Sequence, residues 1–428
     1  MSEGKGLPSA SILENAQFNA LVVVPNALQG IFKRRERAVG IATAAGVDRR
    51  AVSFLGSLRR KHAGSPVWVR VGLNPAILVF RERDIKRVLG GSPDPFAPDP
   101  EAKRDGMIHF QPDAATISRG KDWESRRAFC ESVLETGADE HSLGERFEAV
   151  VDEEVDRMLA DCGEVITFEP FHHCFQRITR RVIFGDTAAD RDDLTELLGE
   201  LMEAANGMPG ERADRLGELE AGIAGLVEAG EEGSLASRFA DAPVDERTEP
   251  VGQVPHWMFA MGDSLPTNAF RALVLLAADP LAIDSANGNG GALLEGTLEE
   301  AMRLWPTTAM LSRVTIAPIE WGGQRVEAGT QVVIVNTFNH RDPDGCPFAD
   351  EFSPEEWTEG DAPESWRFNQ LSHGPQGCPG AGLAKDIGVT ALARILEQRE
   401  LEGADPDLDL DAPLPHSLDF FSAKVRVG

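Results

Sequence analysis

The residues best placed to do chemistry lie in one short run, Leu371-Ser-His-Gly-Pro-Gln-Gly-Cys-Pro-Gly380. Glycines and prolines surround Cys378, and a helical pattern begins near Ala381. Because glycine has no side chain, such a loop lets another body approach its backbone closely. A cysteine just before a helix N-terminus lies at the positive end of the helix dipole, which favours the thiolate. The pattern predicts a charged sulfur that faces a body such as a large flat metal cofactor; a buried structural thiol is the alternative.

This run resembles the haem-ligand loop of the cytochrome P-450 superfamily, whose pattern is Phe-x-x-Gly-x-x-x-Cys-x-Gly. Gly374, Cys378 and Gly380 occupy the matching positions. The resemblance implies that the cofactor is haem b (iron protoporphyrin IX) and that Cys378 is the axial thiolate ligand of its iron, which favours O–O cleavage. Leu371 stands where the family has Phe. Gln376 stands where the family usually has Arg or His for a haem propionate, and it donates hydrogen bonds without carrying charge.

A second motif, Glu300-Ala-Met-Arg303, lies on a predicted helix from Leu293 to Trp305 that Pro306 ends. Residues three apart share a helix face, so the carboxylate and the guanidinium can pair. The motif resembles the structural Glu-x-x-Arg pair of the family, which holds the core behind the haem.

The family often adds an arginine to that pair from a Phe-x-Pro-Glu-Arg segment. This chain has Phe352-Ser-Pro-Glu-Glu356, so an acid stands where the arginine is expected. Two acids beside one arginine repel each other. We therefore expect either that Arg341 or Arg367 compensates or that Glu356 faces solvent.

A third motif, Trp123-Glu-Ser-Arg-Arg127, lies on a predicted helix from Lys121 to Glu135. Residues four apart share a face. The motif resembles the Trp-x-x-x-Arg of the family, in which the indole N–H and the guanidinium bind a haem propionate. Arg313 matches a further propionate-binding arginine. Because Gln376 carries no charge, the resemblance implies that Trp123, Arg127 and Arg313 balance more of the propionate charge; a core tryptophan on an amphipathic helix is the alternative.

The helix expected over the haem runs from His256 to Ala278 and contains Ala260-Met-Gly-Asp-Ser264. This run resembles the family pattern Ala-Gly-x-Asp/Glu-Thr, in which an acid and an alcohol deliver protons to oxygen. The resemblance implies catalytic roles for Asp263 and Ser264, and Thr267 is a further polar candidate. Pro266 predicts a kink, because it removes one backbone hydrogen bond.

The remaining pattern predicts a mainly α fold with minor β, and the resemblance implies the triangular haem-thiolate cytochrome P-450 fold. Val67 to Phe80 predicts two strands around a turn at Leu73 to Pro75, and Ser92 to Gly120 predicts a long loop. Leu143 to Phe239 is helical and acidic. No repeat or linker divides the chain, so we expect one catalytic domain over residues 1–428, with residues 1–63 as an N-terminal segment outside the resemblance.

The composition argues against several classes of partner. Asp and Glu total 70 against 42 Lys and Arg, which gives a formal net charge of −28. Nucleic acids and anionic lipid surfaces attract clustered cations, so we expect neither nucleic acid nor membrane as a partner. Five widely spaced cysteines do not form a disulfide framework. The chain shows no leader sequence and no apolar run of ~20 residues, so we expect a cytoplasmic protein.

The resemblance implies haem-dependent monooxygenation of a small, largely apolar molecule with O2. Electrons come from a ferredoxin or flavodoxin-type partner, since no dinucleotide fingerprint follows Cys378. By analogy, natural-product tailoring is the leading expectation for the substrate. One alternative is different haem-thiolate chemistry: peroxide-driven oxidation, rearrangement, coupling or nitrogen transfer. The other is a haem gas carrier or sensor. We expect Ser92 to Gly120, Gly207 to Gly210 and Met258 to Thr267 to line the substrate pocket.

Overall fold

A computed structural model describes residues 6–207, 214–279 and 290–428 of the chain. As predicted, the fold is mainly α with minor β. The N-terminal helices are α1 (Ile12–Phe18), α2 (Val24–Gln29), α3 (Glu36–Ala44) and α4 (Val47–Lys61), and a π-helical turn at Asn19–Val23 joins the first two. The later helices are α5 (Glu82–Gly90), α6 (Glu101–Met107), α7 (Gly120–Val133), α8 (Gly144–Asp161), α9 (Phe168–Phe184), α10 (Asp192–Gly207), α11 (Leu216–Ala229), α12 (Pro250–Phe259), α13 (Leu265–Ala278), α15 (Gly290–Leu304), α16 (Asn336–Asn339), α17 (Glu355–Thr358) and α18 (Ala381–Gln398).

Three small sheets accompany the helices. The largest contains, in spatial order, β1 (Val67–Val71), β2 (Asn74–Val79), β8 (Gln331–Val335), β5 (Met310–Thr315) and β3 (Phe96–Ala97). Its β2 and β8 pair in parallel, and its other neighbouring strands are antiparallel. A second sheet has the order β4 (Val165–Thr167), β10 (Lys424–Val427) and β9 (Leu401–Asp405), and β6 (Ile319–Trp321) pairs with β7 (Gln324–Val326).

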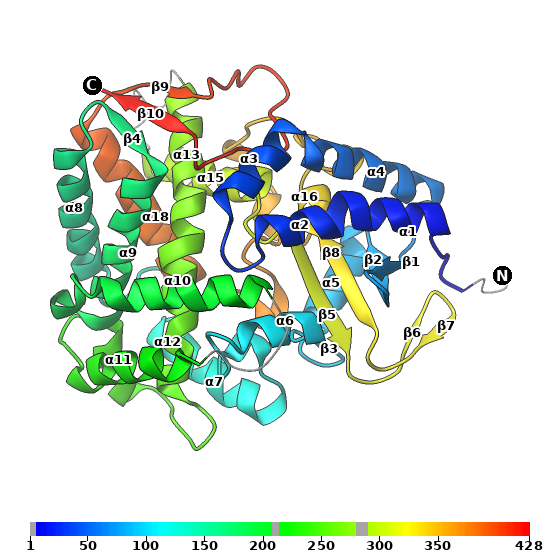
Figure 1. Ribbon diagram of the computed structural model, residues 1–428, viewed down its shortest axis with the longest axis horizontal. Coiled ribbons are helices and arrows are strands. Elements are labelled where there is room, and N and C mark those ends of the chain that lie inside the picture. The colour runs from blue at the N-terminus through cyan, green and yellow to red at the C-terminus, as the bar shows by residue number, and fades with distance from the viewer. Residues whose placement is uncertain (1–5, 208–213, 280–289) are drawn as a thin grey trace.

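The largest sheet and the long helices lie in different halves of the molecule. In Figure 1 the sheet and helices α1 to α4 occupy one half, helices α8, α9 and α18 occupy the other, and α13 runs between them. Every residue of α13 from Leu265 to Leu276 is buried, as expected for a helix that is apolar on all sides. On the sheet side, Phe18 and Leu55 pack the N-terminal helices against the strands. In the described part of the chain, no helix has both the length and the apolar character needed to cross a bilayer.

The helix predicted over the haem contains a π-helical turn. Residues Ala260–Ser264 form this turn between α12 and α13, and the N–H of Leu265 bonds to the carbonyl of Ala260. Pro266 follows directly, as the second residue of α13, and has no N–H to donate to the preceding helical turn. The irregularity predicted at Pro266 thus lies next to the π-helical turn.

The segment Ser92 to Gly120 is not one long loop, so that prediction was wrong. It contains β3, α6 and a 3-10 turn at Ala115–Ile117. The sequence of α6 is polar and lacks the apolar periodicity by which a helix is found. The hairpin predicted around Leu73 is confirmed. The break predicted at Gly207 to Gly210 falls mostly on residues 208–213, which lie outside the described residues.

Glu300 and Arg303 on α15 form a completely buried ion pair, as their spacing predicts. Arg303 donates through Nη2 to Glu300 Oε1 (2.8 Å) and through Nε to Glu300 Oε2. It also donates to the carbonyl oxygens of His340, Ala349 and Glu351. A buried charge is tolerated when it is paired and its remaining donors are bonded. The pair therefore ties the segment 340–351 to α15.

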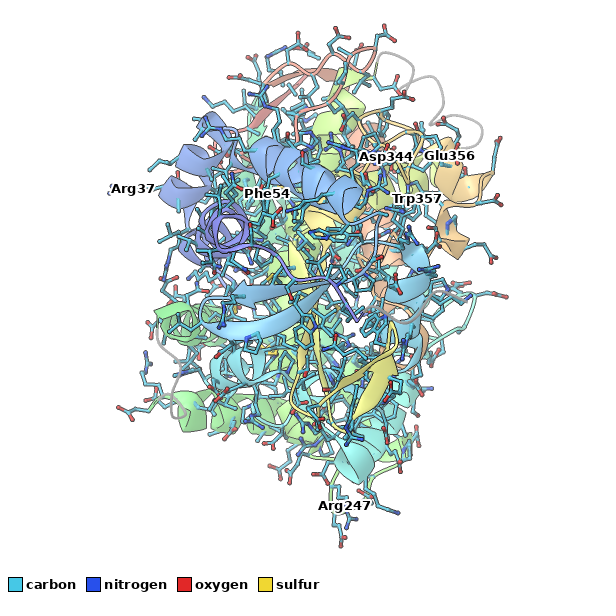
Figure 2. All side chains as sticks on the ribbon, turned by 90° about the vertical axis from the view of Figure 1, so that its right-hand side faces the viewer. Arg37, Phe54, Arg247, Asp344, Glu356 and Trp357 are labelled. Atoms are coloured by element: carbon cyan, nitrogen blue, oxygen red, sulfur yellow. The ribbon has the colours of Figure 1, made fainter. Side chains whose placement is uncertain are left out.

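The third partner of this pair is a tryptophan, not an arginine. Trp357 Nε1 donates to Glu300 Oε2 over 2.9 Å. Within the described ranges neither Arg341 nor Arg367 pairs with Glu356, because each has another acid as its partner, so the predicted compensation was wrong. Glu356 is half-exposed and lies near the margin of the molecule in Figure 2.

We predict that Trp357→Phe destabilises the protein. The variant keeps the ring but removes the N–H, which leaves a buried carboxylate oxygen with one donor fewer and lowers the free energy of unfolding by about 1–3 kcal/mol. Glu356→Gln, one residue away, is the matched control and changes it by less than about 0.5 kcal/mol. Guanidinium chloride unfolding followed by circular dichroism measures both. Equal effects of the two substitutions would contradict the assignment of Trp357.

Candidate active site

A cavity lies beside Cys378, between α7, the α12 to α13 helix, the segment after α15 and the cysteine loop (residues 369–380). Its volume is about 290 Å³. The site residues predicted from the sequence that line it are Trp123, Arg127, Ser264, Leu371, Gln376, Cys378 and Gly380. Asp263, Thr267, Arg313 and Gly374 are not among the lining residues.

The cysteine loop is held by its own backbone. Cys378 N–H donates to the carbonyl oxygen of Leu371 (2.8 Å), and Gly377 N–H donates to that of Gly374 (2.9 Å). Gly374 has φ +68°, and a Cβ there would lie 2.7 Å from the carbonyl oxygen of Leu89. Only glycine satisfies both the angle and the close approach. The loop thus presents the Cys378 sulfur in one fixed place, just before α18.

Burial of the Cys378 thiol opposes the effect that the helix dipole has on its pKa. Burial raises the pKa of the Cys378 thiol, while the backbone N–H of Gly380 and the charge of Arg127 act to lower it. The prediction of a charged sulfur from the helix dipole was therefore incomplete, because it did not include desolvation. A bound metal ion removes this barrier, since a coordinating thiol loses its proton outright.

Two buried donors on the cavity wall have no partner in the described chain: Trp123 Nε1 and Gln376 Nε2. Leaving a buried donor unbonded is costly, so such groups usually mark a missing acceptor. An acidic group bound in this cavity supplies acceptors for both. The arrangement fits a ligand that carries carboxylates on the side of the cavity nearest α7.

The two predicted arginines are placed differently. Arg127 lines the cavity and is engaged: Nη1 donates to the carbonyl oxygen of Gly377 (2.6 Å) and Nε to Glu131 (2.6 Å). Arg313 lies behind the wall, where Nε donates to Ser92 Oγ (3.1 Å). Burial lowers the pKa of Arg313 to about 10, and no carboxylate among the described residues pairs with it.

Lys103 is a buried cation that the sequence analysis missed. Its Nζ donates to the carbonyl oxygen and the hydroxyl of Thr116 (2.8 and 2.9 Å), and Thr116 lines the cavity. Burial first, and the charge of Arg313 second, lower the pKa of Lys103 to about 7. No motif marks this lysine, because the helix that carries it was read as loop. Arg313 is thus a cation behind a wall whose lining residues include no acid, whereas Lys103, on which the charge of Asp99 also acts, is only partly charged at neutral pH.

Of the three predicted catalytic residues, the structure brings only Ser264 to the cavity. Asp263 points to α9, where its Oδ1 lies 2.9 Å from His172 Nε2. Thr267 Oγ donates back to the carbonyl oxygen of Asp263 (2.8 Å). Asp263 therefore faces α9, whereas Ser264 lines the cavity.

Asn268 is the polar residue that joins Ser264 on the cavity wall. Its Oδ1 is buried without a partner in the described residues, and it lies one helical turn beyond Ser264. Spacing by four from Ser264 would have identified it. Met261 and Ala260 also line the wall, so methionine occupies the place where the family has glycine.

Comparisons with known proteins agree with this geometry. Residues 292–414, which include both Glu300 and Cys378, match the cytochrome P-450 family model. The chain is 28% identical over 201 residues to putative cytochrome P-450 137 of Mycobacterium tuberculosis, covering 46% of this chain but only 40% of that protein. It is 38% identical over 98 residues to cyclooctat-9-en-7-ol 5-monooxygenase of Streptomyces melanosporofaciens, covering 23% and 20%. The chain thus spans less than half the length of these relatives.

The likeness of the fold extends much further along the chain. The crystal structure of CYP175A1 from Thermus thermophillus superposes with a TM-score of 0.66 over 89% of this chain and 96% of that one, at 16% identity. At this identity the likeness concerns the fold alone. Residues 292–414 therefore match the cytochrome P-450 family, and the fold as a whole is similar to that of CYP175A1.

Proposed function

We propose that this chain, as one catalytic domain, is a haem b-dependent monooxygenase with Cys378 as the thiolate ligand. One observation carries the proposal: the Cys378 loop forms the wall of a cavity that also holds two buried donors without acceptors, on Trp123 and Gln376. A haem supplies what these groups lack, a metal for the sulfur and propionate oxygens for the donors. When bound, it supplies the redox chemistry that activates O2.

Several residues of the chain hold the haem, each in a different way. Trp123 and Gln376 donate to the propionates, and Arg127 orients the loop through its bond to Gly377. Arg313 supplies positive charge behind the wall. Gly380 and Leu371 give the flat ring room beside Cys378, and Gly374 keeps the loop in shape.

The substrate we propose is a small, largely apolar molecule. Phe259, Met261, Leu265, Met302 and Leu311 line the cavity and offer mostly apolar surface. The Streptomyces relative is named a monooxygenase of cyclooctat-9-en-7-ol, which supports oxidation of a small molecule; tailoring of a natural product is our proposal for the role. Electrons arrive from a separate ferredoxin or flavodoxin-type protein. The cytoplasmic location stays a prediction.

One observation favours a second candidate, peroxide-driven oxidation by the same site. The Asp263 carboxylate faces His172 and not the cavity, so the acid of the resembled motif does not reach the cavity. Hydrogen peroxide brings two oxygens and two hydrogens, so RH + H2O2 gives ROH + H2O with no electrons or protons drawn from elsewhere, and a site whose expected acid faces away from the cavity suits it. Dependence on a reductant separates the two candidates.

We predict a strongly red-shifted absorption band for the purified protein after reduction and exposure to CO, because a thiolate ligand alters the electronic structure of haem iron. Cys378→Ala loses this band. Cys162→Ala is the matched control and keeps it, because Cys162 is a half-buried thiol that does not line the cavity. The proposal is contradicted if the purified parent protein holds no haem, or if its band is unshifted and Cys378→Ala leaves the band unchanged.

We predict that Gly374→Ala weakens haem retention. The added Cβ meets the Leu89 carbonyl oxygen at 2.7 Å at a φ of +68°. Such strain costs about 1–3 kcal/mol. Gly382→Ala on α18 is the control, because nothing lies within 4 Å of its Cβ, and it raises stability by about 0.5–1 kcal/mol. Transfer of haem to an excess of apomyoglobin measures the rate of haem loss from each variant. A faster loss from Gly382→Ala than from Gly374→Ala would contradict the loop assignment.

We predict that Ser264→Ala reduces oxidation driven by O2 and a ferredoxin system by about 100-fold, the size expected when a positioned proton donor is removed. Asp263→Asn has a smaller effect, since its carboxylate lies outside the cavity. The assay compares product formed with reductant consumed for a small apolar compound that perturbs the haem spectrum. If both variants retain full turnover, and peroxide alone supports it in the parent protein, the second candidate replaces the first.

A further inference from the structure

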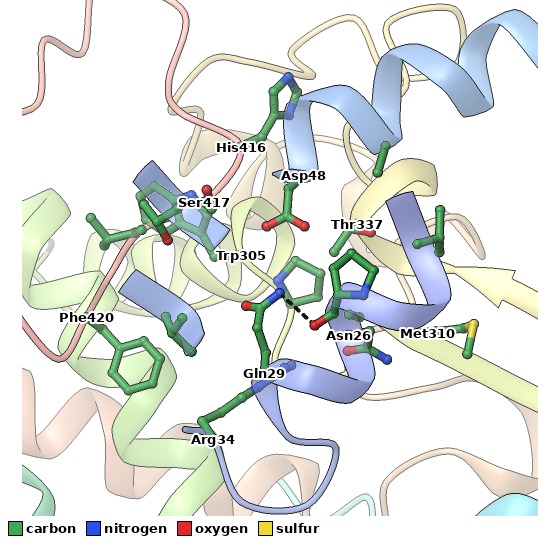
Figure 3. Close-up of a pocket in the computed structure, with 18 of the residues that line it drawn as sticks. Asn26, Gln29, Arg34, Asp48, Trp305, Met310, Thr337, His416, Ser417 and Phe420 are labelled. Carbon is green, nitrogen blue, oxygen red and sulfur yellow. Dashed lines mark hydrogen bonds between the residues drawn. The ribbon is translucent and has the colours of Figure 1, made fainter. Parts of the chain in front are cut away.

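A second, smaller cavity lies outside the Cys378 site, between the N-terminal helices, α13 and the segment 416–420. Its volume is about 60 Å³. Four titratable side chains line it: Arg34, Asp48, Arg271 and His416. Figure 3 shows the side chains of Asp48 and Gln29 pointing toward one another across this space. Neither motif nor family resemblance accounts for this cluster.

Arg271 is the most enclosed of these groups, with 8% of its surface exposed. Its Nη1 donates to the carbonyl oxygen of Trp305 (2.5 Å), and its guanidinium lies 4.8 Å from the centre of the Phe420 ring. Its Nε is buried without a partner, and no carboxylate among the described residues forms an ion pair with it. Burial, reinforced by the charge of Arg34, lowers the pKa of Arg271 to about 9. It remains a cation at neutral pH; the charge of Asp48 acts on it in the opposite direction, without a direct ion pair.

The other three groups do not neutralise it. Arg34 donates through Nη2 to the carbonyl oxygen of Thr307 (2.8 Å) and is a second cation on the same wall. Asp48 is the one acid on the wall; burial raises the pKa of its carboxyl, the charges of Arg34 and Arg271 act to lower it, and within the described residues it forms no direct ion pair with either arginine. Burial lowers the pKa of His416 to about 4, so that ring is neutral at pH 7. The cavity thus holds two cations against at most one anion.

This arrangement selects for an anion. A charge removed from water is stable only when it is paired and hydrogen-bonded. The planar guanidinium matches the two oxygens of a carboxylate, whereas both arginines repel a metal cation. The volume of about 60 Å³ exceeds the ~10–15 Å³ that one water needs, so a carboxylate group fits. We propose that this cavity binds a carboxylate between Arg34 and Arg271.

The carboxylate has two possible sources, a free small acid or the acidic end of the molecule that enters the Cys378 cavity. Pro306 lines both cavities, and Thr307, which accepts the Arg34 hydrogen bond, lines the Cys378 cavity. The second source rests on the proposed function; the first does not.

The test uses acetate as the probe and the purified full chain. Raising sodium acetate at constant ionic strength, balanced with sodium chloride, increases the thermal unfolding midpoint of the parent protein along a saturable curve. The substitutions Arg34→Gln and Arg271→Gln each weaken the binding of acetate at least tenfold. Arg37→Gln is the matched control: it removes the same charge three residues from Arg34, from an exposed side chain that Figure 2 shows at the molecular margin, and acetate binds unchanged.

The substitution Asp48→Asn changes the affinity for acetate in the opposite direction from the arginine variants. It removes the competing negative charge and keeps the shape, so acetate binds about tenfold more tightly. If the cavity holds only water and an internal charge cluster, the parent protein shows no saturable response, Asp48→Asn gains none, and the proposal falls. The increase expected for Asp48→Asn also keeps the proposal falsifiable if an arginine variant fails to fold.

Hexanoate and hexanamide then separate the two sources in the haem-loaded protein. If the acid belongs to the substrate, hexanoate perturbs the haem absorption spectrum, hexanamide does so at least tenfold more weakly, and Arg34→Gln abolishes the difference. If acetate binds but neither compound perturbs the spectrum, the site takes a free acid. Acetate binding by a protein that retains no haem would count against the proposed function and leave this site intact.

Discussion

The buried pair of Glu300 and Arg303 is the constraint on which the rest of the site depends. Neither side chain touches water, so every donor of Arg303 must find an oxygen, and it finds three of them on the carbonyls of the segment 340–351. His340 in turn accepts from the backbone N–H of Asn369, where the cysteine loop begins (3.3 Å). From the same helix, Glu299 accepts from Gln370 (2.8 Å). Helix α15 thus fixes the loop that carries the sulfur, although it contributes no group that contacts the sulfur.

Sequence reasoning found the parts of the site that depend on short-range spacing. The Cys378 loop, the Glu300–Arg303 pair and the Trp123 helix are each set by residues within ten positions of one another, and local geometry follows from such spacing. The mainly α fold was also predictable, because long amphipathic and apolar patterns indicate helices.

The parts that sequence reasoning missed depend on long-range packing or on a local change of helix type. The π-helical turn at Ala260–Ser264 interrupts the helix that carries Asp263 and Ser264. No alternation of apolar and polar residues reports such a turn. Trp357 takes the place of an arginine one position earlier, and Lys103 lies on a polar helix that has no periodic signal.

The two cavities share a feature that the net charge of the whole chain does not reveal. The chain carries a net charge of −28, yet the buried charge around both cavities is mainly positive. Arg313 and Lys103 lie behind the first wall, and Arg34 and Arg271 line the second. Burial makes the charged form of a side chain less favourable, and an anion that binds beside it offsets this cost. Salt screens the charges of surface acids over a distance of ~8 Å, so these acids do not balance a buried cation. The balancing anion therefore has to belong to the bound ligand. We therefore interpret each cavity as built around the acidic group of its ligand: propionates in the first and a carboxylate in the second.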